Sequence, residues 1–267
     1  MISKLASITF LLFVMSACAW ASPIAFAVDN NDNLYTVDLA TASKTLVGST
    51  GQFLEGLAMS PGGVLFGTSD TGNLYTINKV TGAATLVGNT GLGDLEGLVF
   101  NGSTLLAVNF TSSGPSTIYS LNTSTGTPTA LVTESSSTGL DVAMAVLDAN
   151  DVLISGNTNN TLYKVNLTTG GVTTIGIMTD LNLIAALSFL SNGNLYALDS
   201  GGNAYQVNPN NAALSSIGST GSNFWLDMTT NGGSISGPAT PEPATLSLLG
   251  AGLALFGLRL RRPRTAR

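Results

Sequence analysis

The stretch Asn73–Gly91, NLYTINKVTGAATLVGNTG, decides the fold, because recognisable copies of it recur along the chain. Aligned on a shared tyrosine, successive copies are spaced by 40, 44, 44 and 42 residues. The aligned residues are Tyr35, Tyr75, Tyr119, Tyr163 and Tyr205. The copies consist of short β-type runs separated by Gly, Asn, Asp and Ser, without helical periodicity of useful length. We therefore expect an all-β domain of repeated units.

Each unit divides into four predicted strands, which in the best-formed unit span 54–59, 64–68, 73–78 and 84–87. Repeats of this length are typical of a β-propeller, in which each blade is one four-stranded sheet. The first unit begins on a second strand, 24–29, and the matching first strand appears only at 224–230, FWLDMTT. We predict a five-bladed β-propeller over residues 22–230, closed by pairing of the C-terminal strand with the N-terminal blade.

The packing of such blades makes a prediction for side chains. Blades pack face to face, so both faces of most strands should be covered. We therefore expect the repeated tyrosines to pack between blades. We also expect Leu86 and Val87, in the fourth strand of their unit, to be covered.

Residues 1–21 have the pattern of a secretory signal peptide. Lys4 supplies a positive start, an apolar run follows, and Ala19-Trp20-Ala21 is a small-x-small cleavage site. We predict cleavage after Ala21 and export by the Sec machinery. The alternative is a lipoprotein signal, in which Cys18 would carry the lipid.

Residues 231–240 resemble a flexible spacer, and the character of the chain changes again at 241–267. Pro241-Glu242-Pro243 is followed by an apolar run at 244–258 and then by an arginine cluster. As a helix the run would measure about 22 Å, shorter than a hydrocarbon core of about 30 Å. We predict a short transmembrane helix whose arginines stay in the cytoplasm. They are Arg259, Arg261, Arg262 and Arg264.

This order of Pro-Glu-Pro, short apolar helix and arginine cluster resembles the PEP-CTERM sorting signal of Gram-negative bacteria. The resemblance implies recognition by an exosortase, transient anchoring in the inner membrane, and removal of the tail. It further implies a final location at the cell surface or outside the cell, in organisms that produce exopolysaccharide and biofilm. It covers residues 241–267 only and carries nothing about the activity of the propeller.

Composition excludes several classes of function. The chain has no histidine, and its single cysteine, Cys18, lies in the leader. Ser-His-Asp and Cys-His catalysis and His-ligated zinc are therefore excluded. Between the terminal segments only Lys44, Lys79 and Lys164 face 14 acids, a formal charge of −11. Such a domain repels phosphate backbones, so we expect no nucleic-acid partner, and cations are more suitable ligands.

Four acids lie near the starts of the predicted first strands, which line the centre of a propeller: Glu55, Glu96, Asp141 and Asp227. Such carboxylates could be structural, could bind Ca²⁺ or a glycan, or could act as the acid and base of a glycosidase. Alignment places Ala143 and Ala185 at the Glu55 position, so the ring of acids is incomplete. No other cofactor is expected.

The run Asp29-Asn30-Asn31-Asp32-Asn33 is compatible with a calcium loop, but such residues also form tight turns between strands. We favour turns. For the whole chain we expect a non-enzymatic surface or matrix interaction module, with extracellular polysaccharide as a candidate ligand. A channel-centred glycosidase-like hydrolase and a calcium-binding propeller are the alternatives.

Overall fold

The computed structural model describes residues 23–109, 114–139, 141–156, 160–179, 182–221 and 224–230. The predicted signal peptide, the spacer and the C-terminal tail lie outside these residues. Within the described ranges, no helix is long and apolar enough to cross a membrane.

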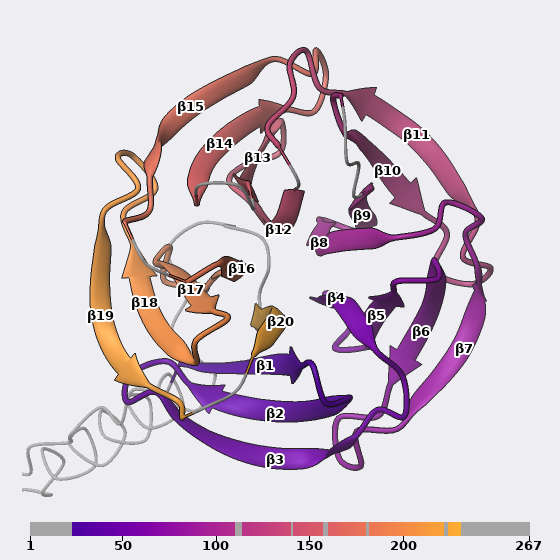
Figure 1. The fold of residues 1–267 in the computed structure, drawn as a ribbon. Coiled ribbons are helices and arrows are strands. Elements are labelled where there is room, and N and C mark those ends of the chain that lie inside the picture. Colours follow the sequence, from indigo (N-terminus) through magenta and orange to yellow (C-terminus); the bar gives the residue numbers. More distant parts are fainter. Residues whose placement is uncertain are drawn as a thin grey trace, which may run out of the picture.

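The described chain forms five four-stranded antiparallel sheets, arranged as blades around a central axis (Figure 1). Blade 1 contains β20 (Trp225–Thr230), β1 (Ile24–Asp29), β2 (Asn33–Asp38) and β3 (Ser43–Ser49), and blade 2 contains β4 (Leu54–Met59), β5 (Leu65–Ser69), β6 (Asn73–Ile77) and β7 (Ala84–Asn89). Blade 3 contains β8 (Leu95–Asn101), β9 (Thr104–Asn109), β10 (Thr117–Leu121) and β11 (Pro128–Thr133). Blade 4 contains β12 (Asp141–Val146), β13 (Asp151–Gly156), β14 (Thr161–Asn166) and β15 (Val172–Ile177), and blade 5 contains β16 (Ile184–Phe189), β17 (Leu195–Asp199), β18 (Asn203–Val207) and β19 (Leu214–Ser219). The predicted five-bladed propeller is confirmed.

Strand β20 closes the ring. It pairs antiparallel with β1, in a register that runs from Ala25 opposite Thr230 to Asp29 opposite Trp225. Each innermost strand also contacts the next around the axis, with β20 between β16 and β4. The C-terminal strand therefore completes the N-terminal blade, as the sequence predicts.

The core lies between the blades. Every residue of β16 is buried, and in β4 only Glu55 is not. The Tyr75 side chain is buried in one interblade cluster, and Tyr35, Tyr119 and Tyr205 pack against others. The predicted interblade role is thus confirmed for these four tyrosines.

The outermost strands differ from the expectation. Leu86 in β7 is 58% exposed, so the prediction that it would be covered was wrong. Leu46, which faces the corresponding tyrosine in blade 1, is 57% exposed. An outermost strand runs along the rim (Figure 1), where one of its faces meets solvent rather than another blade.

Local hydrogen bonds explain a glycine-bearing turn that ends three of the units, at residues 48–51, 88–91 and 218–221. Thr50, Thr90 and Thr220 follow β3, β7 and β19, and each donates its backbone N–H and its hydroxyl to a carbonyl in the second turn of its own blade. These carbonyls belong to Asp32, Gly72 and Gly202. The threonines therefore join the end of the rim strand to the β1–β2 turn or its equivalent in the same blade. This accounts for the repeated segments GSTG at 48–51 and 218–221 and GNTG at 88–91.

Candidate functional site

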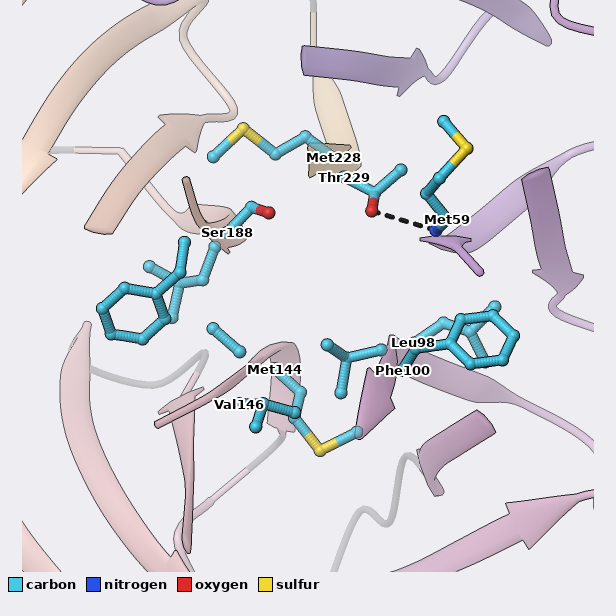
Figure 2. A pocket seen from close by; sticks show the side chains of 12 residues that line it. Met59, Leu98, Phe100, Met144, Val146, Ser188, Met228 and Thr229 are labelled. Atoms are coloured by element: carbon cyan, nitrogen blue, oxygen red, sulfur yellow. Dashed lines mark hydrogen bonds between the residues drawn. The ribbon is translucent and has the colours of Figure 1, made fainter. Parts of the chain in front are cut away.

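The middle of the propeller axis holds little free space. Figure 2 shows side chains of the inner strands at this level, where the Met59, Phe100 and Met144 side chains extend away from the axis, and the cavity that these strands line measures only about 10 Å³. The Thr229 hydroxyl accepts a hydrogen bond from the backbone N–H of Met59 at 3.1 Å. A cavity of this size has room for about one water molecule.

A larger cavity, of about 140 Å³, opens where the inner strands begin. It is lined by Glu55, Glu96, Val142, Leu183, Ala185, Phe224 and Leu226. In β4, β12 and β16 the ladder skips one residue at this level, because of an irregular register. The skipped residues Glu55, Val142 and Ala185 are the ones that line the cavity.

The same registers correct one alignment. Val142, rather than Ala143, occupies the position of Glu55 in blade 4, because Ala143 pairs with Ser155 as Gly56 pairs with Thr68. The assignment of Ala185 to the Glu55 position holds. The ring of acids is incomplete, as expected, but its apolar members include a valine.

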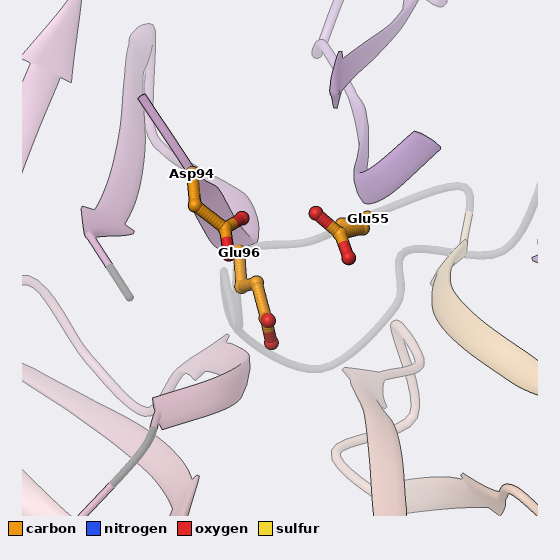
Figure 3. A group of neighbouring side chains, drawn as sticks. All are labelled: Glu55, Asp94 and Glu96. Atoms are coloured by element: carbon orange, nitrogen blue, oxygen red, sulfur yellow. The ribbon is translucent and has the colours of Figure 1, made fainter. Parts of the chain in front are cut away.

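Three carboxylates gather at the edge of this cavity, and we call them the acidic cluster: Glu55, Asp94 and Glu96 (Figure 3). One oxygen from each lies within 4.8 Å of the others. Glu55 and Glu96 are the second residues of the neighbouring inner strands β4 and β8, and Asp94 immediately precedes β8. Asp94 was not among the candidate residues predicted from the sequence. Its position beside Glu55 and Glu96 depends on the turn at Gly91 and Gly93, both of which have positive φ.

The electrostatics of the cluster favour a shared proton. Burial raises the pKa of Glu55 to about 8, helped by its hydrogen bond to Asp94 and by the charges of Asp94 and Asp70. Burial also raises the pKa of Asp94, although the hydrogen bond from Glu55 acts in the opposite direction. Glu55 Oε2 and Asp94 Oδ1 are buried and have no hydrogen-bond partner among the described residues. Such oxygens are suited to a cationic ligand.

Asp227 lies elsewhere. Its side chain is 1% exposed and does not line the acidic cavity. It accepts hydrogen bonds from the backbone N–H groups of Leu57 at 2.7 Å and Met228 at 2.8 Å. Burial nevertheless raises the pKa of Asp227 well above its usual range. The arrangement joins β20 to β4, so the carboxylate contributes to closure of the ring.

Asp141, the remaining candidate, begins β12 and pairs with Gly156. Its side chain is outside the described part of the structure. The candidate residues of the two terminal segments, Ala19, Ala21, Pro241, Glu242, Pro243 and the arginines, are outside it as well.

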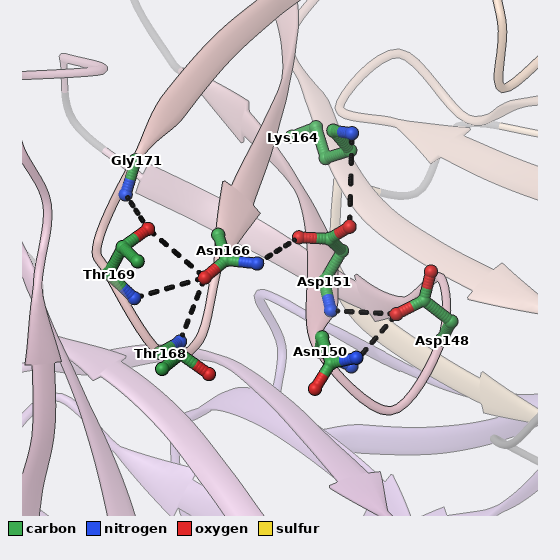
Figure 4. Close-up of polar contacts among 8 residues, drawn as sticks. All are labelled: Asp148, Asn150, Asp151, Lys164, Asn166, Thr168, Thr169 and Gly171. Carbon is green, nitrogen blue, oxygen red and sulfur yellow. Dashed lines mark hydrogen bonds and ion pairs between the residues drawn. The ribbon is translucent and has the colours of Figure 1, made fainter.

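The Asp- and Asn-rich loops form turns. Asp29 is buried, and its Oδ1 accepts the backbone N–H groups of Asn31 and Asn33 at 3.1 and 3.0 Å. In Figure 4, Asp148 caps Asn150 and Asp151 in the same way, and Asn166 caps the two residues that follow Leu167. These contacts favour the turn interpretation of the run Asp29–Asn33, and the loop at Asp148 forms a turn of the same kind.

Comparison with known proteins bears on the tail and on the fold. A family model described as the PEP-CTERM protein-sorting motif matches residues 239–262. No curated protein matches the sequence. A chain in the crystal structure of a nidogen/laminin complex is similar at a TM-score of 0.55 and 14% identity, covering 80% of this chain and 82% of that one. The calcium-binding protein regucalcin from Agrobacterium tumefaciens gives a TM-score of 0.48 and 17% identity, over 73% and 70% of the two chains.

Structural similarity at such low identity shows the fold alone. The sorting motif, in contrast, is a sequence match at the residues where the Pro-Glu-Pro and arginine elements were identified. The chain is therefore an exported five-bladed β-propeller protein that carries a PEP-CTERM protein-sorting motif.

Proposed function

We propose that the protein is a non-enzymatic interaction module, which an exosortase releases from the membrane to act at the cell surface or in the extracellular matrix. The observation that carries the proposal is the sorting motif at 239–262, placed only a few residues beyond a closed propeller that ends at Thr230. A closed ring forms a compact domain that can be exported, and the sorting motif directs this domain to the exosortase. The absence of histidine from the sequence agrees with a binding role.

The sorting part can be tested in the producing organism. Replacement Glu242→Ala, or deletion of residues 259–267, should leave unprocessed protein in the membrane fraction. Replacement Asp38→Asn is the matched control, because Asp38 caps a turn at the rim and asparagine caps the same turn in blades 2 and 3. Unchanged secretion and processing of the Glu242 variant would contradict the proposal.

A polysaccharide is the partner we propose for the surface. An open groove of about 440 Å³ on blade 3 is lined almost entirely by hydroxyl and amide side chains, among them Thr104, Ser120 and Asn122. Neutral donors and acceptors of this kind suit the hydroxyls of a glycan. Pull-down with the exopolysaccharide of the producing organism should retain the protein, and Thr129→Val in the groove should weaken retention. Absence of binding to any polysaccharide would remove this part of the proposal.

Calcium binding at the acidic cluster is a second candidate function. Three carboxylates supply the hard oxygen ligands that Ca²⁺ takes, and two of their buried oxygens have no hydrogen-bond partner among the described residues. Glu55, Asp94 and Glu96 would hold the ion. Its binding would require loss of the shared proton, so affinity should increase with pH up to about 8, the pKa of Glu55.

Calorimetric titration with CaCl₂ at pH 6 and pH 8.5 tests this candidate. Binding should be tighter at pH 8.5, and Glu55→Gln and Glu96→Gln should each weaken it at least about tenfold, since each removes a charged ligand. Asp38→Asn should leave it unchanged. No measurable binding by the parent protein at pH 8.5 would rule out the site.

A glycosidase-like hydrolase is the remaining alternative. Glu55 and Glu96 lie close enough for a carboxylate pair. The other residues that line the cavity are all apolar, however, and provide no side-chain donors for sugar hydroxyls. The geometry therefore supports cation binding better than glycoside hydrolysis.

A further inference from the structure

We propose that, while its tail is in the membrane, the propeller stands with one defined face toward the lipid and with the acidic cluster on the face directed outward. The proposal rests on the membrane anchoring that the sorting motif implies. It assigns lipid as the neighbour of one face and leaves the other to soluble partners.

The two faces are defined by the direction of the inner strands. The acidic face carries the starts of β4, β8, β12, β16 and β20, the second turn of each blade and the connections between blades. The terminal face carries the ends of these strands, the first turns of blades 2 to 5 and the third turn of each blade. Thr230 ends β20 on the terminal face, and the opposing register places Ile24 there too. Both ends of the described propeller chain therefore leave from the terminal face.

The length of the connection limits how the propeller can stand. Fourteen residue steps separate Thr230 from residue 244, where the apolar run begins. Fully extended they span about 46 Å, but a flexible chain of this length has a root-mean-square end-to-end distance of only about 20 Å. Thr230 lies in the innermost strand of its blade (Figure 1).

To place the acidic face on the lipid, the connection would have to pass over four strands to the rim and then along the thickness of the blade. At about 4.8 Å per strand and about 3.3 Å per residue of strand, that path is about 40 Å. The connection could cover this path only when nearly fully extended, at about twice its root-mean-square length, which costs chain entropy, whereas the terminal face is within easy reach.

The distribution of charged residues over the two faces favours the same orientation, independently of the length of the connection. Five acids that are exposed or partly exposed lie on the acidic face: Asp32, Glu55, Asp70, Asp94 and Glu96. Within the described ranges, no lysine or arginine belongs to the inner-strand starts or the second turns of that face.

The terminal face is closer to neutral. Its exposed or partly exposed acids are Asp38, Asp148 and Asp151, and Lys79 and Lys164 lie on the same face. Lys164 pairs with Asp151 at 3.8 Å, and Lys79, in the third turn of blade 2, lies beside Gly63 in the first turn. Phosphate headgroups would repel the acidic face more strongly than the terminal face. The acidic cavity is thus open to cations and partners before the tail is removed.

Energy transfer to labelled lipid tests the orientation. The full chain, with Cys18→Ser and its tail retained, would be purified from cells without exosortase. It would be placed in phosphatidylcholine vesicles that contain 30% phosphatidylglycerol and acceptor-labelled lipid at roughly one molecule in a hundred. Donor dye would be attached at Ser103→Cys on the terminal face or Thr71→Cys on the acidic face, both exposed. A second pair of labelling sites, Gly62→Cys on the terminal face and Gln52→Cys on the acidic face, repeats the comparison if either variant of the first pair folds poorly.

Transfer from the terminal-face label should exceed that from the acidic-face label at least twofold, because the faces are about 20 Å apart along a six-residue strand. Equal transfer, or greater transfer from the acidic face, would overturn the orientation while leaving the proposed anchoring intact. Failure of the full chain to float with the vesicles would instead overturn the anchoring, and the orientation with it. A chain that ends at residue 238 is the control and should show no transfer from either label.

Discussion

Replacing Glu55 by glutamine should make the folded protein more stable at alkaline pH and almost unchanged at acidic pH. Glutamine keeps the shape of the side chain but cannot ionise. In the parent protein the folded-state pKa of Glu55 is about 8, against an ordinary value of 4.5. Folding therefore favours the protonated side chain, and ionisation works against the folded state.

The sign and size of the change in stability follow from this shift in the pKa of Glu55. The folded state holds the Glu55 proton more tightly than the unfolded chain, so this stabilisation is complete below pH 4.5 and is lost as pH rises toward 8. The full shift would be worth about 5 kcal/mol. Because the side chain is partly exposed, screening by solvent reduces the expected effect to about 1–2 kcal/mol.

Urea unfolding of residues 22–240 at pH 5 and pH 9, without calcium, measures this effect. Trp225 is buried and is the only tryptophan of that segment, so its fluorescence reports the unfolding. Glu55→Gln should match the parent at pH 5 and exceed it by about 1–2 kcal/mol at pH 9. Asp38→Asn, at the rim, should reproduce the parent's pH dependence. A Glu55→Gln variant that is less stable than the parent at pH 9 would refute the reasoning.

Four further substitutions, of which Gly62→Ala is a control, test closure and packing. Trp225→Ala removes a fully buried indole from β20 and should cost about 3–5 kcal/mol, measured by circular dichroism during urea unfolding. Gly48→Ala would bring a Cβ within 2.1 Å of the Thr81 carbonyl oxygen in the next blade and should cost about 1–3 kcal/mol, whereas Gly62→Ala has space and should change stability by less than about 0.5 kcal/mol. Asp227→Asn should destabilise the protein less at pH 9 than at pH 5, because the raised pKa makes the parent carboxyl costly when ionised. Equal losses from Gly48→Ala and Gly62→Ala, or from Asp227→Asn at both pH values, would contradict these accounts.

The number of blades could be predicted because each repeat contains turns that are held by hydrogen bonds within its own blade. Thr50 and Thr90 hold the rim strands in place, and Asn78 caps the turn before β7, all through contacts within a blade. A missing first strand at one end of the chain and a spare strand at the other then indicate closure. The exposure of Leu86 could not be deduced in this way, because it depends on where the rim strand lies relative to the next blade.

The site was only partly predictable. Glu55 and Glu96 could be identified from their equivalent places in two LEGL segments. Asp94 joins them through a turn with positive φ at Gly93, and Val142 reaches the cavity because the ladder in blade 4 skips it. Both facts depend on backbone geometry that alternating sequence patterns do not report. Asp227 has the same chemistry as Glu55 but lies at a level where backbone N–H groups of neighbouring residues surround it.

We propose that an exosortase releases the exported propeller at its sorting motif. Intact mass measurement of the secreted protein, in cells with and without exosortase, tests it most directly. We predict a secreted species that contains the propeller through Thr230 and lacks the apolar run at 244–258, and a membrane-bound species with the complete tail when exosortase is absent. A secreted protein that retains residues 241–267 in both strains would contradict the account.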